Sequence, residues 1–228
     1  MSLVQGLDAG VPLRFVLFQE IRSLIVAGML LPGQQLRDEE LAGELGVSRG
    51  PVREAFQLLE YAGWAEIRPR SGAFVREPSV EENNEVFELR TILEEHSARM
   101  AAERATEQDL IRLAAALEES NRELARDDTH RRDHARVSIH SAIRQIAGNT
   151  RIRELTADLD ARIAWCFVPL VRSRREQALL EHDALVRSIT QRDPDRAARL
   201  ARQHSEDTQQ IFLRLAGVAS DGDEHRPG

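Results

Sequence analysis

Residues 39–55 read EELAGELGVSRGPVREA, in which two helical patterns are separated by a short turn around Gly46. The first pattern predicts a helix over about 38–45, ended by this glycine. The second predicts a helix over about 49–62, with Ser48 as its N-cap and Pro51 in its first turn. Two short helices joined by a tight turn are typical of a helix-turn-helix.

The flanking sequence extends this motif to a winged form. One helix and two short strands are expected around it, over about 13–25, 64–68 and 73–76. Residues 69–72 form the turn between the strands. The dipeptide Pro78-Ser79 then forms a linker, and its serine can cap the next helix.

From residue 79 to about 218 the chain shows long amphipathic patterns with few Gly or Pro residues. Six helices are expected, over about 80–105, 107–127, 131–148, 151–173, 175–192 and 194–217. Thr106 with Asp109, and Asp193 with Pro194, are typical helix starts. Apolar stripes on such helices favour packing as a bundle.

The predicted fold class is therefore mainly α, in two domains. Residues 1–78 form a winged helix-turn-helix of three helices plus a small β-hairpin wing. Residues 79–219 form an all-α bundle of about six helices, and residues 220–228 form a disordered tail.

Composition narrows the classes of function. The 228 residues contain no Lys, which excludes a Schiff base and a phosphate-binding loop lysine. The single cysteine, Cys166, cannot form an intramolecular disulfide, which fits a reducing compartment.

No secretory signal is recognisable, and charged residues interrupt the most apolar early stretch, 11–31, so we expect a cytoplasmic protein with no membrane segment. The net charge of −7 argues against coating of nucleic acid but permits a local basic face.

The second helix of the motif carries such a face. Arg49, Arg53 and Gln57 are spaced four apart, on a stripe that differs from the inward apolar one. Arg can contact guanine and Gln can contact adenine through two hydrogen bonds in a major groove. Any one of these side chains could be an ordinary solvated residue, but their combination with the turn and a basic wing favours DNA binding.

The expected wing adds a second contact. Arg68, Arg70 and Arg76 flank its tip, and Gly72 lets a backbone approach closely, as in a wing that enters a minor groove. The predicted DNA-binding residues are Arg37, Ser48, Arg49, Gly50, Arg53, Gln57, Arg70 and Gly72.

Residues 15–75 resemble the winged-helix DNA-binding domain of the GntR family of bacterial transcription regulators. The matching segments include Leu31-Pro32-Gly33, Gly46-Val47-Ser48-Arg49, Pro51-Val52-Arg53-Glu54-Ala55 and Gly72-Ala73-Phe74-Val75. The resemblance implies that Arg49 and Arg53 contact bases or phosphates and that Gly72 lies at the tip of the wing.

Three histidines of the helical segment have apolar neighbours one turn away. His140, His182 and His204 are thus each expected to face the interior, from three different helices. Inward imidazoles from separate helices can converge on a metal such as zinc or nickel. Spacing alone favours three unrelated core histidines.

Residues 86–215 resemble the FCD effector domain of the FadR-like branch of the same family, and this changes the expectation. Many relatives bind a metal there through three histidines and an acidic residue one turn before the first. Here that position is Arg136, which cannot ligate a metal. The resemblance therefore leaves two alternatives: a three-histidine site for a divalent metal (zinc or nickel), completed by water or an effector oxygen, or a pocket without metal. In both, Arg90, Arg136 and Asn149 would bind an anionic effector.

The predicted function is a ligand-responsive transcriptional regulator, a repressor and not an enzyme. As a homodimer it would bind a short palindromic operator in double-stranded DNA and sense a small organic acid or similar anionic metabolite. Two alternatives stay open: the bundle is a metal-dependent enzyme attached to a DNA-binding domain, or it is solely a dimerisation scaffold.

Overall fold

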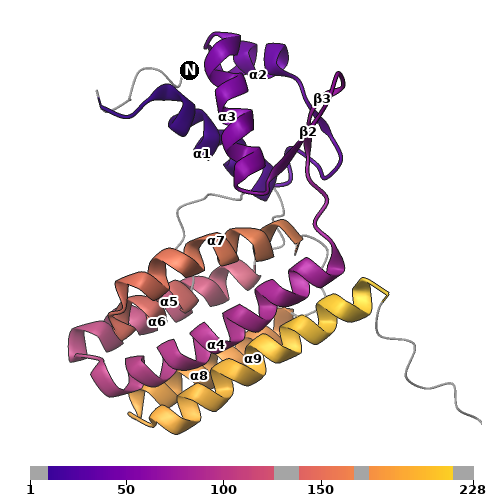
Figure 1. Ribbon diagram of the computed structural model, residues 1–228. Helices are drawn as coiled ribbons and strands as arrows, with labels where there is room; N and C mark the ends of the chain where they lie inside the picture. The colour runs from indigo at the N-terminus through magenta and orange to yellow at the C-terminus, as the bar shows by residue number, and fades with distance from the viewer. Residues whose placement is uncertain (1–9, 126–138, 167–174, 218–228) are drawn as a thin grey trace, which may run out of the picture. The chain divides into compact units, whose positions relative to one another are not determined.

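The computed structural model describes residues 10–125, 139–166 and 175–217 (Figure 1). The chain divides into two compact units, Met1–Pro78 and Ser79–Gly228. Each unit has its own buried apolar core.

The first unit is the expected winged helix-turn-helix. Its helices are α1 (Leu13–Val26), α2 (Asp38–Leu45) and α3 (Arg49–Tyr61), and its strands are β1 (Gln35–Leu36), β2 (Ala65–Arg68) and β3 (Gly72–Val75). The sheet is antiparallel in the order β1-β3-β2. The hairpin of β2 and β3 was expected, whereas β1 was not, because two residues carry no recognisable alternation.

Local signals explain the turn between α2 and α3. Gly46 ends α2 in the left-handed conformation, with φ of 69°. Ser48 stands at the N-cap position of α3, but its side chain makes no capping hydrogen bond, which corrects the expectation that its hydroxyl caps the helix. Fully buried Val52 and Leu59 place one face of α3 against α1. The opposite face of α3 is left at the surface.

The second unit contains, among the described residues, the six expected helices. They are α4 (Val80–Arg104), α5 (Glu107–Ala125), α6 (Ile139–Ala147), α7 (Thr150–Cys166), α8 (Arg175–Thr190) and α9 (Pro194–Leu215). The parts of the expected helices that fall within 126–138 and 167–174, and the expected tail, lie outside the described residues. None of the described helices is both long and apolar enough to cross a membrane.

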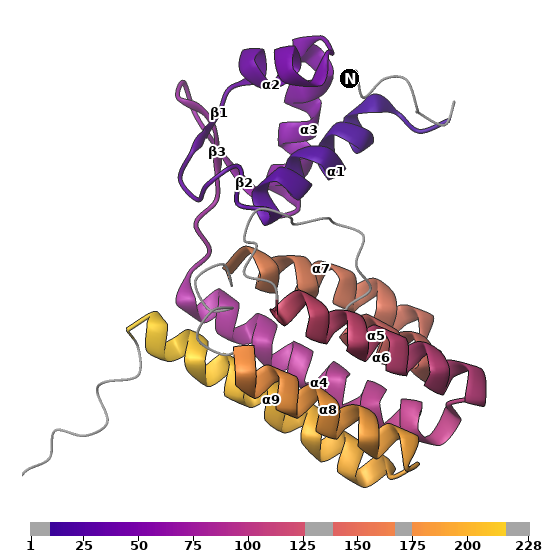
Figure 2. The same cartoon turned by 180° about the vertical axis from the view of Figure 1, so that it is seen from behind.

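Helix α4 is the centre of this bundle. It packs along α9 and also contacts α6, α7 and α8. Figure 2 shows α8 and α9 side by side, with α4 behind them. Fully buried Ala98, Ala101 and Ala102 lie in the core on this helix, where small side chains allow close approach of its neighbours.

Three predicted helix starts of the bundle, those of α4, α5 and α9, are confirmed by their caps. Ser79 and Glu82 form a capping box, with Glu82 N donating to Ser79 Oγ at 3.1 Å. The backbone N–H of Thr106 donates to Asp109 at 3.0 Å, and that of Arg196 donates to Asp193 at 2.9 Å. These caps set where α4, α5 and α9 begin, and so which residues face the core.

Candidate functional site

The exposed face of α3 carries the three side chains predicted to meet DNA. Arg49, Arg53 and Gln57 are all exposed, while Val52 and Ala55 between them are buried. Arg53 and Gln57 line a groove of about 800 Å³ together with residues of β1, the start of α2 and the wing. Its lining includes Arg37 and Gly72, so four of the eight predicted residues share one concave surface.

The remaining predicted residues lie at the start of α3 and on the wing. Ser48 and Gly50 are exposed at the N-terminus of α3, and a Cβ at Gly50 would meet open space. Arg70 lies in the hairpin turn with φ of 64°, a conformation uncommon for a residue with a side chain. Gln35 supports this turn, since its Nε2 donates to the Ser71 carbonyl at 2.8 Å.

Both arginines of α3 contact one carboxylate that sequence reasoning missed. Asp38 accepts hydrogen bonds from Arg49, at 3.0 Å from Nη2 to Oδ1, and from Nε of Arg53. Partial desolvation raises the pKa of Asp38, but the bonds from Arg53 and Arg49 outweigh it and hold that pKa below its usual value. The pairing joins side chains 11 and 15 residues apart, a separation that carries no local signal.

The three histidines of the bundle converge, although their spacing alone favours unrelated core positions. His140 on α6, His182 on α8 and His204 on α9 have ring centroids 4.9–5.1 Å apart. One ring nitrogen of each lies within 4.8 Å of those of the other two. All three side chains are buried. The nitrogen of a neutral imidazole is a common ligand of zinc and nickel.

Two carboxylates orient two of the three rings. Nδ1 of His140 lies 3.1 Å from Glu94, and Nδ1 of His204 lies 2.6 Å from Glu181. A carboxylate accepts, so Nδ1 carries the hydrogen and Nε2 keeps its lone pair for a ligand. Burial lowers the pKa of His204 to about 4, which keeps its imidazole neutral at pH 7.

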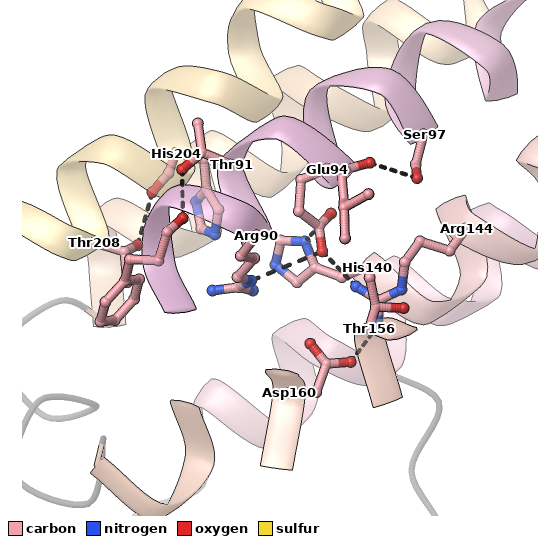
Figure 3. Close-up of polar contacts among 12 residues, drawn as sticks. Arg90, Thr91, Glu94, Ser97, His140, Arg144, Thr156, Asp160, His204 and Thr208 are labelled. Atoms are coloured by element: carbon pink, nitrogen blue, oxygen red, sulfur yellow. Dashed lines mark hydrogen bonds and ion pairs between the residues drawn. The ribbon is translucent and has the colours of Figure 1, made fainter. Parts of the chain in front are cut away.

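A network of buried charge surrounds His140 (Figure 3). Arg144 contacts Glu94 through Nη1 and Asp160 through Nη2, and Nε of Arg90 lies 3.8 Å from Glu94. Burial raises the pKa of Glu94, but His140 and the two arginines outweigh it and hold that pKa far below its usual value. Two four-residue spacings are sequence signals for this network: Arg90 and Glu94 share one face of α4, and His140 and Arg144 share one face of α6.

The predicted effector residues have different surroundings. Arg90 is buried beside Glu94 in this network. Asn149 is exposed and caps the start of α7, accepting from the backbone N–H of Arg151 and Ile152 at 3.1 and 3.2 Å. Arg136 lies outside the described residues.

Comparison with known proteins identifies both units. Residues 16–75 match the model of the bacterial regulatory proteins of the gntR family, and residues 85–207 match the FCD domain. The Uxu operon transcriptional regulator of Escherichia coli is 29% identical over 87% of this chain and 86% of its own. The HTH-type transcriptional repressor RspR of Escherichia coli is 29% identical over 97% of this chain and 98% of its own. The structure of E. coli McbR/YncC is similar in fold, with a TM-score of 0.76 and 22% identity over 90% of this chain and 99% of its own.

Proposed function

The chain belongs to the GntR family of bacterial transcriptional regulators and carries an FCD domain, and from this we propose that it is a ligand-responsive repressor acting in the cytoplasm. It binds a short palindromic operator in double-stranded DNA as a homodimer. A small organic acid, sensed by the helical unit, changes its affinity for that operator.

The observation that carries DNA binding is the groove of the first unit. Arg53 and Gln57 from α3, and Gly72 from the wing, line one concave surface. Exposed guanidinium and amide groups on a recognition helix can read base edges, and a glycine at a wing tip lets phosphate approach the backbone. Two copies related by a two-fold axis would meet an inverted repeat.

Arg53→Ala tests this assignment. A duplex is first enriched from a random pool on the wild-type protein, and its affinity is then measured by fluorescence anisotropy. The variant should lose about 1–3 kcal/mol of binding free energy if Arg53 contacts a base. Arg14→Ala is the matched control, because this exposed arginine of α1 pairs with Glu54 and is absent from the lining of the groove. Equal affinity of Arg53→Ala and wild type would contradict the assignment.

For the second unit we propose a divalent-metal site at His140, His182 and His204, with zinc or nickel as the ion. Support comes from the clustering of their ring nitrogens and from the carboxylates that orient two of the rings. The bound metal would supply an open coordination position for an oxygen of the effector. The buried guanidinium of Arg90 supplies charge for a carboxylate, and Arg136 remains a predicted second partner of the effector.

Metal content tests this site. The protein purified with added zinc or nickel should retain about one ion per chain, and His182→Ala should lose it. His96→Ala is the control, because this histidine is exposed on α4 outside the cluster. Elemental analysis of the three proteins measures the outcome. Retention of metal by His182→Ala at the wild-type level would contradict the proposal.

The Uxu operon regulator and RspR are both transcriptional regulators, which favours sensing over catalysis for the bundle. A bundle that serves solely as a dimerisation scaffold remains the second candidate. The buried charges around His140 favour the sensing role, because desolvated Arg and Glu side chains are expensive to keep in a core whose only task is packing.

A further inference from the structure

We propose that Asp38 is a positioning residue for DNA recognition: its carboxylate holds the guanidinium groups of Arg49 and Arg53 in the orientation that reads bases, and its charge opposes non-specific binding. The inference rests on the proposed DNA-binding function of α3. It assigns to Asp38, which contacts both arginines, a role that is exerted through them.

The contacts use one edge of each guanidinium. Asp38 Oδ2 lies 3.3 Å from Nε and 3.2 Å from Nη2 of Arg49, and Oδ1 lies 3.0 Å from the same Nη2. On Arg53 the described contact involves Nε alone. The Nη1 and Nη2 groups of Arg53 are thus left for the two acceptors of a guanine.

The Asp38 side chain is much less exposed to solvent than the two arginine side chains that it contacts. The Asp38 side chain is 19% exposed, against 51% for Arg49 and 63% for Arg53. Asp38 is the first residue of α2, where the helix N-terminus stabilises a negative charge. The Asp38 carboxylate is therefore fixed and ionised, while the long side chains of Arg49 and Arg53 extend from it into solvent.

Such a pairing contributes little to the stability of the fold, because exposed ion pairs are weakened by solvent and by side-chain entropy. Its main effect is on the affinity and selectivity of DNA binding. A long arginine side chain that is already restrained loses less entropy when it meets a base, and a fixed orientation discriminates among bases.

The charge of Asp38 has a second effect. It reduces the two positive charges of Arg49 and Arg53 to a net charge of one. Phosphate contacts supply essentially all of the affinity for non-specific DNA, whereas base contacts supply sequence selectivity. Asp38 should therefore lower affinity for arbitrary DNA and raise it for the operator.

The test compares two duplexes and three full-length proteins. One duplex is enriched from a random pool on the wild type, and the other is a scramble of equal length and composition. Asp38→Asn should bind the scramble about threefold or more tightly, and the enriched duplex about fivefold or more weakly. Glu44→Gln is the matched control, since it removes the same charge from an exposed residue of α2 that is absent from the lining of the groove, and none of the described ion pairs joins it to either arginine. Its ratio of affinities should stay within about twofold of wild type.

A second readout separates positioning from charge. In duplexes with single base-pair changes, the position whose discrimination is lost in Arg53→Ala should also lose discrimination in Asp38→Asn. Equal tightening on both duplexes would overturn the inference, because Asp38 would then act as a competing charge alone. An unchanged ratio would overturn it as well.

Asp38→Glu keeps the experiment decisive if Asp38→Asn does not fold, as judged by circular dichroism. The longer side chain retains the charge but shifts the carboxylate, so affinity for the scramble should stay near wild type while selectivity falls. Wild-type selectivity in this variant would overturn the inference. Failure of the wild type to enrich any duplex is a different result, because it overturns the DNA-binding proposal itself and this inference with it.

Discussion

At the scale of single residues, the histidine cluster depends on charged side chains from other helices. Glu94 is 1% exposed and meets His140, Arg144 and Arg90, so its carboxylate is surrounded by donors. A buried carboxylate that lost these partners would be strongly destabilising. The same carboxylate gives His140 its orientation, which links the stability of the core to the geometry of the site.

The burial of His204 predicts a pH dependence of stability in metal-free protein. Its pKa of about 4 lies below the unfolded value, so its contribution is complete above pH 6.5 and is lost as pH falls toward 4. Between pH 7 and pH 5 the free energy of unfolding should drop by about 2 kcal/mol from this group. Urea denaturation after chelation measures the change.

His204→Gln should show a smaller drop over that interval, because Gln does not titrate. His96→Gln, at an exposed position of α4, should follow the wild type. A His204→Gln protein with the full wild-type pH dependence would show that another group is responsible.

At the scale of elements, the turn between α2 and α3 sets the position of the recognition helix. Gly46 adopts φ of 69°, and its N–H donates to the carbonyl of Ala42. A side chain at this position is strained, whereas Gly43 lies within α2 and a Cβ there would meet open space. Substitutions of Gly46 and Gly43 can therefore be compared directly, because one glycine ends α2 and the other lies within it.

Gly46→Ala should lower the free energy of unfolding by about 1 kcal/mol, because alanine resists the left-handed conformation. Gly43→Ala should raise it by up to about 1 kcal/mol through helix propensity. Chemical denaturation of both variants checks the sign of each effect. Destabilisation by Gly43→Ala to the same extent would show that α2 is limited by something other than backbone conformation.

At the scale of the whole molecule, the winged helix-turn-helix unit and the helical FCD unit each have their own core. A dimer would let one effector site influence two DNA contacts. Leu89 and Ile92 are exposed on α4, three residues apart on one helix face, and exposed aliphatic side chains so placed favour self-association.

The wild type should therefore sediment as a dimer at micromolar concentration. Replacing Leu89 and Ile92 together with Glu should shift it toward monomer, because charge would have to be desolvated in the contact. Ile111→Glu, at an exposed position of α5, should leave the dimer intact. A monomeric wild type with full operator affinity would contradict the dimer model.

The sequence by itself determined the elements and much of their chemistry. Turn glycines, caps such as Ser79 and Asp193, and helical periodicity act within a few residues, so they predicted the winged motif and the bundle. They also placed Arg53 and Gln57 on an outward face of α3 and His140, His182 and His204 on inward faces. The sequence did not predict strand β1, because its two residues become a strand only by pairing with β3.

Only the tertiary structure decided what these side chains meet. His140 and His182 are 42 residues apart, and Glu94 and Arg144 are 50 apart, so no local signal specifies their contact. The pairing of Asp38 with Arg49 and Arg53 likewise depends on how α2 packs against α3. Periodicity determines the face on which a side chain lies, whereas convergence of several faces on one point depends on how the helices pack, and packing is a property of the whole core.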